Sequence, residues 1–525
     1  MARSPSRKRE SNPSVAAPPQ PASATRQERI LVWIVTFYVA VLVMMVAFNR
    51  YAFIMKSLIV PVLLLAAVLS GRLKRFVNDW VVFVAAVEFF EFGRGLAYAL
   101  TSHLELPMHL AYVLRFERWL CGGAIAPEGV QQLRARLTDT YWPDRFFVLI
   151  YSSHFLFFLV FGLIVWSTRR PAFRAYAWSI LGVLYGGLAG YFLVPTIPPW
   201  MAANDFLVIP PITQLVRTLY NVHVPRLVAA FDVNTIAAMP SVHAAIPAAC
   251  ALFAWRHYRR RSLPVVIYAV LVWIAVIYLG EHYLTDVLAG ILLALVIHIV
   301  VSRWIPVSSE RVEETDDERW QVQPIAIALT LVAAAYGFGQ LTARWIGPLP
   351  ITQDFVERNL LGKSPLAHYY LGRIAHDHKD FHAAEVELAQ SLNELSHPDQ
   401  QKVIRAYLGI SAYRNGNLAN AIRALEPQRA RLDDLDSLVL LSQAYVDNGQ
   451  YDDAVALLHD MRNRFADAPE PLYWLARQQY LHGDVDRARV AQVIDALKQY
   501  PPDKADPLRL SLSDLLRQGR TGTGG

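Results

Sequence analysis

The sequence predicts an all-α protein in which a polytopic bundle of transmembrane helices precedes a helical solenoid. Three observations support this prediction. The chain is 54% hydrophobic and has a mean hydropathy of +0.26, values too high for an ordinary soluble protein. Between residues 30 and 345, the apolar residues gather in windows of about 20 residues, the length that crosses a bilayer as a helix. The last third of the chain is polar and repeats at intervals of 33 to 37 residues.

About nine apolar segments are expected to span the membrane, and six of them, from the third to the eighth, form the catalytic core. The first segment should remain as an uncleaved anchor, because it is longer than the apolar region of a signal peptide and lacks small residues at a cleavage position. The expected spans are 30–48, 52–70, 77–100, 145–167, 175–194, 237–256, 263–281, 284–303 and 323–345.

Six segments follow from this pattern. They are a disordered basic tail (1–28), two N-terminal membrane helices (29–76), the catalytic membrane core (77–304), a charged linker with the last membrane helix (305–350), a repeat domain (351–518) and a flexible tail (519–525).

Clusters of arginine and lysine orient the expected helices. They precede the first span, follow the second, and separate the fourth from the fifth and the sixth from the seventh. If nine helices alternate, all these clusters fall on one side, and basic loops mark the cytoplasmic side. The segments 101–144 and 195–236 and everything after residue 345 are therefore expected outside the cytoplasm. Because the basic residues lie in short loops, the net charge of +6 does not indicate nucleic-acid binding.

The polar C-terminal third contains four copies of one pattern. Each copy has a leucine, an aromatic or aliphatic residue ten positions later and an alanine thirteen positions later, starting at Leu371, Leu408, Leu441 and Leu475. Glycines mark the expected turns between paired helices in the last three copies, at Gly416, Gly449 and Gly483. This pattern resembles the tetratricopeptide repeat family, whose helix pairs stack into a solenoid. Such arrays usually bind a protein partner, here unidentified; a purely spacing or stabilising role is the alternative.

Two polar motifs lie at the same expected outer face of the membrane core. One contains Ser241 and His243, and the other contains His282 with Asp286 four residues later. On a helix, residues four apart share a face, so Asp286 can orient one imidazole nitrogen of His282 and leave the other as a nucleophile or base. His243 is then available as a second acid or base. Together these groups can displace an alkoxide from phosphorus through a phosphohistidine.

These motifs resemble the second and third signatures of the type 2 phosphatidic acid phosphatase superfamily. Four strings resemble its inositol phosphorylceramide synthase-like (inositolphosphotransferase) branch: ERWL at 117–120, YSSHF at 151–155, PTIPP at 195–199 and AAMPSVH at 237–243. The resemblance covers about residues 77 to 303. It implies that His282 is the nucleophile, Asp286 its orienting partner and His243 the acid that protonates the leaving group.

The chain departs from the superfamily at the groups that hold phosphate. Phosphatase-type members carry the string Lys-x6-Arg-Pro, but Arg170 and Pro171 have Leu163 at the lysine position and lie on the expected cytoplasmic side. Val276 stands where an arginine is expected six residues before the third-motif histidine. Two phosphate-binding cations of the phosphatase type are therefore missing, and other groups must neutralise the phosphoryl oxygens.

We expect the substrate phosphate to be bound by Arg94, His154 and Ser241. An arginine at the depth of Arg94 should face a polar cavity; an interfacial ion pair with Glu88 or Glu91 is the alternative. No carboxylate cluster or Cys/His spacing fits a metal, and we expect neither a metal nor a cofactor.

The leading functional hypothesis is an integral membrane enzyme of lipid metabolism with its active site outside the cytoplasm. It would transfer a phospho-head group from a phospholipid-type donor to a lipid alcohol. Hydrolysis of a lipid phosphate or diphosphate is the nearest alternative, because the chemistry up to the intermediate is identical. A non-enzymatic, membrane-anchored tetratricopeptide scaffold is the second alternative.

Overall fold

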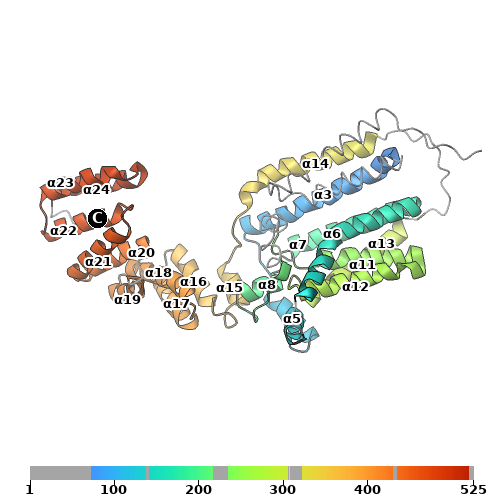
Figure 1. Cartoon of the computed structure of the whole chain (residues 1–525), viewed down its shortest axis with the longest axis horizontal. Coiled ribbons are helices and arrows are strands. Elements are labelled where there is room, and N and C mark those ends of the chain that lie inside the picture. The colour runs from blue at the N-terminus through green and yellow to red at the C-terminus, as the bar shows by residue number, and fades with distance from the viewer. Residues whose placement is uncertain are drawn as a thin grey trace, which may run out of the picture.

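The computed structural model describes residues 73–137, 141–216, 234–305, 307, 322–429 and 434–519. In these residues the regular structure is helical, which confirms the all-α fold class. Figure 1 shows a bundle of long helices followed by a curved array of shorter ones. The expected tail 1–28 and the first two expected spans lie outside the described residues.

Long helices of similar direction form the bundle (Figure 1). They are α3 (Leu73–His103), α6 (Trp142–Thr168), α7 (Arg170–Leu193), α11 (Val242–Tyr258), α12 (Leu263–Tyr278), α13 (Leu284–Trp304) and α14 (Val322–Thr342). A short 3-10 turn, Arg259–Ser262, joins α11 to α12. These two helices pack as a hairpin, in which Trp273 Nε1 donates to the carbonyl of Ala244 at 3.1 Å.

Five stretches of the described residues are long and apolar enough to cross a membrane, judged by length and composition. They are Trp142–Thr168, Arg170–Leu193, Val242–Tyr278 (which holds both α11 and α12), Leu284–Trp304 and Val322–Gly339. These stretches coincide with the expected spans from the fourth to the ninth. The third expected span forms α3, a helix of 31 residues that is not among the five stretches. The count of nine spans remains a prediction.

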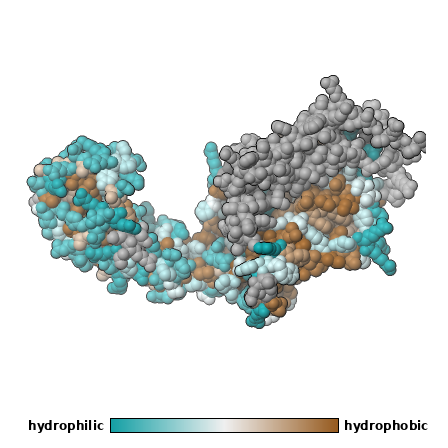
Figure 2. Space-filling model, in the orientation of Figure 1, coloured by the Kyte–Doolittle hydropathy of each residue, from teal (hydrophilic) through white to brown (hydrophobic). Residues whose placement is uncertain are grey.

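The bundle is apolar outside as well as inside. Its buried core contains aromatic side chains such as Trp80 and Tyr176, both 0% exposed. On the outside, Leu149, Leu292 and Ile299 are each more than half exposed. Figure 2 shows hydrophobic residues gathered on the visible side of the bundle, whereas the C-terminal array is mostly hydrophilic. A helical bundle that is apolar all round is typical of a membrane domain, and the protein is an integral membrane protein.

Short helices and loops cover one end of the bundle, which we call the site end. The helices are α4 (Ala111–Leu120), α5 (Ala126–Leu137) and α8 (Pro199–Asn204). Three loops are joined there by backbone hydrogen bonds. His109 N donates to Pro195 O at 2.8 Å, Ile197 N donates to His109 O at 3.1 Å, and Thr196 N donates to Ile236 O at 2.9 Å. These bonds fix loops that are far apart in the sequence.

The C-terminal array consists of stacked helix pairs, as the repeat pattern predicts. Its helices are α15 (Gln353–Asn359), α16 (Ala367–Asp377), α17 (Phe381–Glu394), α18 (Pro398–Arg414), α19 (Leu418–Arg429), α20 (Leu435–Asp447), α21 (Tyr451–Arg464), α22 (Glu470–His482), α23 (Arg487–Ala496) and α24 (Pro502–Gln518). Gly409, which directly follows the leucine of the second copy, lets paired helices approach closely. A Cβ added at Gly409 would lie 2.4 Å from the side chain of Leu425.

The first helix of the array packs into the site end. Phe355, Val356 and Leu360 share one buried cluster with Trp200 of α8 and with Tyr283. In addition, the backbone N of Ala111 in α4 donates to Asn359 Oδ1 at 2.9 Å. Although no candidate catalytic group follows residue 351, α15 is thus part of the structure that surrounds the site.

A chain that ends at residue 350 is expected to lose its folded site end, whereas one that ends at residue 396 should stay folded and active. The shorter chain lacks Phe355, Val356 and Leu360, which are at most 3% exposed. Burial of each such side chain contributes about 1.5–3 kcal/mol. The longer chain keeps α15 and the first complete helix pair. Size-exclusion profiles in detergent and turnover of both chains measure the difference. Equal stability and turnover would show that α15 is dispensable.

Candidate active site

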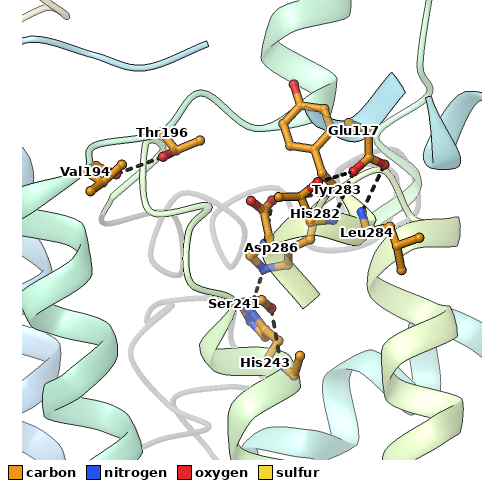
Figure 3. Close-up of polar contacts among 11 residues, drawn as sticks. Glu117, Val194, Thr196, Ser241, His243, His282, Tyr283, Leu284 and Asp286 are labelled. Carbon is orange, nitrogen blue, oxygen red and sulfur yellow. Dashed lines mark hydrogen bonds and ion pairs between the residues drawn. The ribbon is translucent and has the colours of Figure 1, made fainter. Parts of the chain in front are cut away.

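The three residues of the predicted centre lie together at the site end (Figure 3). His243 is in the first turn of α11, His282 shortly precedes α13, and Asp286 is in the first turn of α13. His243 Nδ1 lies 3.1 Å from His282 Nε2. His282 Nδ1 lies 3.6 Å from Asp286 Oδ2. The chain therefore forms a line of two imidazoles and one carboxylate.

Burial of this line determines how its protons are arranged. His282 is 4% exposed and Asp286 is 0% exposed. His282 Nδ1 and Asp286 Oδ1 are buried and make no hydrogen bond within the described residues. Because an unsatisfied buried group is costly, a small rotation that closes the pair is favoured, with the proton on Nδ1. Nε2 then carries a lone pair, and His243 Nδ1 must donate to it.

The backbone holds Asp286 in place. Its Oδ2 accepts from the backbone N of Tyr283 at 2.9 Å, which caps the start of α13. Its carbonyl accepts from the backbone N of Ser241 at 3.0 Å. Close packing of α11 and α13 allows this contact: a Cβ added at Gly290 would lie 2.3 Å from the carbonyl oxygen of Ser241. The backbones of the two motifs are thus joined directly.

A buried carboxylate from α4, Glu117, anchors the start of α13. It is 0% exposed. Its Oε1 accepts from Leu284 N at 3.1 Å and from Ala126 N at 3.3 Å. Its Oε2 accepts from Thr285 N at 2.9 Å and from Thr285 Oγ1 at 2.6 Å. A negative charge at a helix N-terminus is favourable, because it accepts from backbone N–H groups that have no partner within the helix. Glu117 therefore fixes the segment that carries His282 and Asp286 (Figure 3).

A cavity of about 180 Å³ opens beside the two histidines. Hydrophobic side chains from α3, α6, α7 and α11 line much of it, as a lipid substrate requires. Its polar and charged lining residues among those described are Glu91, Arg94, Tyr151, Ser152, His154, Tyr191, Gln214, Asn234, Thr235, His243, Glu281 and His282.

Arg94 lines this cavity and also forms an ion pair with Glu91, which the sequence offered as the alternative to a contact with phosphate. Its Nη1 lies 3.2 Å from Glu91 Oε2, and the two side chains are 15% and 21% exposed. Its backbone carbonyl accepts from Asn234 Nδ2 at 3.0 Å. The guanidinium therefore faces the cavity with one carboxylate already beside it.

His154 lies beside His243, with their ring centroids 4.5 Å apart. Its Nδ1 is 2.8 Å from the carbonyl oxygen of Tyr151. Since a carbonyl oxygen only accepts, Nδ1 carries the proton. In the neutral ring, Nε2 is then an acceptor, and it can donate to a phosphate oxygen only when the ring is protonated.

Ser241 caps α11. Its Oγ accepts from Ala244 N at 3.2 Å, and the residue is 0% exposed. It is not among the lining residues of the cavity in the described structure. Contact of Arg94, His154 and Ser241 with a substrate phosphate remains a prediction.

Comparison with known proteins relates two parts of the chain to known families. Residues 111–300 match the PAP2 superfamily, and residues 439–504 match the tetratricopeptide repeat. The chain is 30% identical over 148 residues to the phosphoinositol dihydroceramide synthase of Bacteroides thetaiotaomicron, covering 26% of this chain and 48% of that relative. The chain thus spans about half the length of this relative. No solved structure shows a significant similarity to the chain. The matched segment 111–300 contains His243, His282 and Asp286, so the three candidate catalytic residues all lie within the part of the chain that is similar to the PAP2 superfamily.

Proposed function

We propose that the enzyme is a lipid phosphotransferase that works through a phosphohistidine on His282. The line formed by His243, His282 and Asp286 carries this proposal. His282 Nε2 attacks the phosphorus of a phospholipid donor, and the bond from phosphorus to the lipid oxygen breaks. His243 gives its proton to the leaving alkoxide. In the second step, His243 takes the proton of an acceptor alcohol, whose oxygen attacks phosphorus and releases His282.

The resting distance implies a movement during this reaction. The two imidazole nitrogens are 3.1 Å apart, which leaves no room for a phosphoryl group between them. Substrate must therefore break the contact between the rings. The proton on His243, which pointed at His282, is then donated to the leaving oxygen. Asp286 compensates the positive charge that forms on His282.

The charges in the cavity favour a phosphodiester donor over a phosphomonoester. The described lining contains the carboxylates of Glu91 and Glu281 and the guanidinium of Arg94. Two carboxylates repel the dianion of a monoester more strongly than the monoanion of a diester. Carboxylate and amide groups also accept hydrogen bonds from a hydroxylated head group, and Gln214 lies 3.4 Å from Glu281 at this position. The relative from Bacteroides is named a synthase, and this name also supports transfer over hydrolysis.

A phospholipid labelled at its head-group phosphate should yield a new labelled lipid when purified enzyme and a lipid alcohol are both present. Without the alcohol, release of a water-soluble phospho-head group should be slow, because water competes poorly in an apolar cavity. Thin-layer chromatography separates these products, and phosphatidic acid in a parallel reaction tests the monoester. Rapid release of inorganic phosphate from phosphatidic acid, with no lipid product from the diester, would identify a phosphatase.

We further propose that the site end and the C-terminal array lie outside the cytoplasm. The loops at the opposite end are basic, and this supports the proposal. Arg259, Arg260 and Arg261 form the turn after α11, and Arg169 lies over the ring of Tyr258 at the same end, 5.4 Å from its centroid.

Cysteines introduced one at a time in a Cys121→Ala background, which keeps only the buried Cys250, should report this orientation. An impermeant maleimide applied to intact cells should label Leu137→Cys, at the site end, and should label Arg260→Cys only after the cells are opened. Leu137 is 74% exposed, so access does not limit the first reaction. The reverse pattern would place the active site in the cytoplasm.

A further inference from the structure

The helix α4 divides its surface into three faces. Its buried face consists of Val113, Leu114 and Glu117. Three aromatic residues spaced four and three apart form a second, exposed face: Tyr112 (42%), Phe116 (48%) and Trp119 (74%). Arg115 and Arg118, three apart, form a third face beside it. A helix with adjacent aromatic and basic faces is typical of one that lies in the surface of a membrane.

Other residues place the surface of the membrane near α4. Tyr141 and Trp142, which are 68% and 67% exposed, stand at the start of α6, where a candidate membrane span begins at the site end. Exposed tyrosine and tryptophan at a span terminus are typical of the membrane–water interface. Glu117 ties α4 to the start of α13, another candidate span, at the same end. The exposed faces of α4 are therefore at the level of lipid head groups.

A hollow of about 310 Å³ lies between α4 on one side and α15 with the turn that follows it on the other. Its cationic lining residues are Arg115 and Arg118 from α4, Arg358 from α15 and Lys363 from the following turn. Apolar residues complete it, and no carboxylate lines it within the described structure. Arg358 pairs with Asp354 of its own helix at 2.6 Å, and this pair is exposed. Four like charges that converge from two domains repel one another unless an anion lies between them.

We propose that this hollow binds the phosphate group of an anionic phospholipid in the leaflet at the site end. The lipid would bridge α4 of the membrane domain and α15 of the C-terminal array. None of the lining residues belongs to the catalytic cavity, so the site is separate from the substrate site. Its position beside an aromatic helix face favours a lipid over a free anion, because the acyl chains of a lipid can follow Phe116 and Trp119 into the bilayer.

Binding is measured on the full chain purified in a neutral detergent. The thermal unfolding midpoint is followed as dioctanoyl phosphatidylglycerol, dioctanoyl phosphatidylcholine or inorganic phosphate is added. Phosphatidylglycerol should raise the midpoint in a saturable way, and the other two should have little effect. Each cation near a lipid surface contributes enough that loss of two should weaken the apparent Kd about 30-fold. We expect this loss both for the variant Arg115→Gln/Arg118→Gln and for Arg358→Gln/Lys363→Gln.

A matched control carries the same change in charge elsewhere. Arg487 and Arg489 of α23 are exposed in the distant part of the array, and Arg487→Gln/Arg489→Gln should respond to phosphatidylglycerol like the unaltered protein. Without lipid, the control should keep the midpoint of the unaltered protein, and the two hollow variants should have the same or a slightly higher midpoint, because they lose exposed like charges that repel one another. An equal response to inorganic phosphate, or an undiminished response in both hollow variants, would overturn the proposal. Loss in only one variant would show that the lipid does not bridge the two domains.

Discussion

His282→Ala should abolish both turnover and phosphoenzyme formation. In the proposed mechanism its Nε2 forms the bond to phosphorus. His154 also lies beside His243 and lines the cavity, but its Nδ1 faces the carbonyl oxygen of Tyr151, whereas Nδ1 of His282 faces the carboxylate of Asp286. Rapid-quench labelling with a labelled donor should show a phosphoenzyme in the unaltered enzyme and none in this variant. Because the ring is almost fully buried, the unfolding midpoint of the variant must be measured alongside to show that it is folded.

His243→Ala should behave differently, because it removes the proton donor and keeps the nucleophile. Activity toward ordinary lipid esters should collapse, whereas a nitrophenyl phosphodiester, whose leaving group needs little protonation, should be partly spared. Asp286→Asn should retain the fold but leave His282 in the wrong tautomer. The analogous exchange in serine proteases lowers kcat about 10⁴-fold. Equal loss on both substrates in His243→Ala, with a phosphoenzyme still present in His282→Ala, would exchange the roles of the two histidines.

Glu117→Ala is the second substitution from which we expect a large effect, although this residue lies outside the line formed by His243, His282 and Asp286. It would leave Leu284 N, Thr285 N and Thr285 Oγ1 without their acceptor in a buried place. Each unsatisfied donor costs about 1–3 kcal/mol. The start of α13 should then shift and move His282 away from Asp286, and displacements of this kind lower rates by about 100-fold. Both kcat and the unfolding midpoint should fall.

Two further variants separate the role of Glu117 from a general loss of charge. Glu117→Gln keeps one acceptor oxygen and should lie between the unaltered enzyme and Glu117→Ala in both measurements. Glu128→Ala on the neighbouring helix α5 removes a carboxylate bonded to Gln132 within its own helix, and should change little. Normal turnover in Glu117→Ala would show that α13 keeps its position without this cap.

The sequence allowed prediction that His243, His282 and Asp286 lie together, because the pattern that they form is local. His282 and Asp286 are four residues apart, and His243 follows a recognisable string. The helices of the fourth to ninth expected spans were predictable for a similar reason, since they coincide with long apolar stretches of the sequence. The repeats were predictable because their spacing recurs, and the match over 439–504 confirms the family.

The supporting contacts could not be predicted because they join distant segments. Glu117 stands in a string that resembles the family, but its partners at 284 and 285 are 167 and 168 positions away. Arg94 illustrates a second difficulty: the sequence offered a phosphate contact or an ion pair as alternatives, and the folded chain places this side chain both in the cavity and beside Glu91. The packing of α15 against the site end likewise joins distant segments, because Phe355 and Val356 share their buried cluster with Trp200 of α8 and with Tyr283.

The contact between Glu117 and α13 also sets the order in which the active site is assembled during synthesis. The ribosome adds about 5–20 residues per second, so the 167 residues that separate Glu117 from Leu284 take roughly 8 to 33 s to make. Throughout that interval, the carboxylate lacks the N–H donors of α13 and must remain hydrated at the surface of the membrane. The segment that carries α4 can therefore settle only after α13 has been inserted. Nascent chains that stall before residue 284 should expose it to protease.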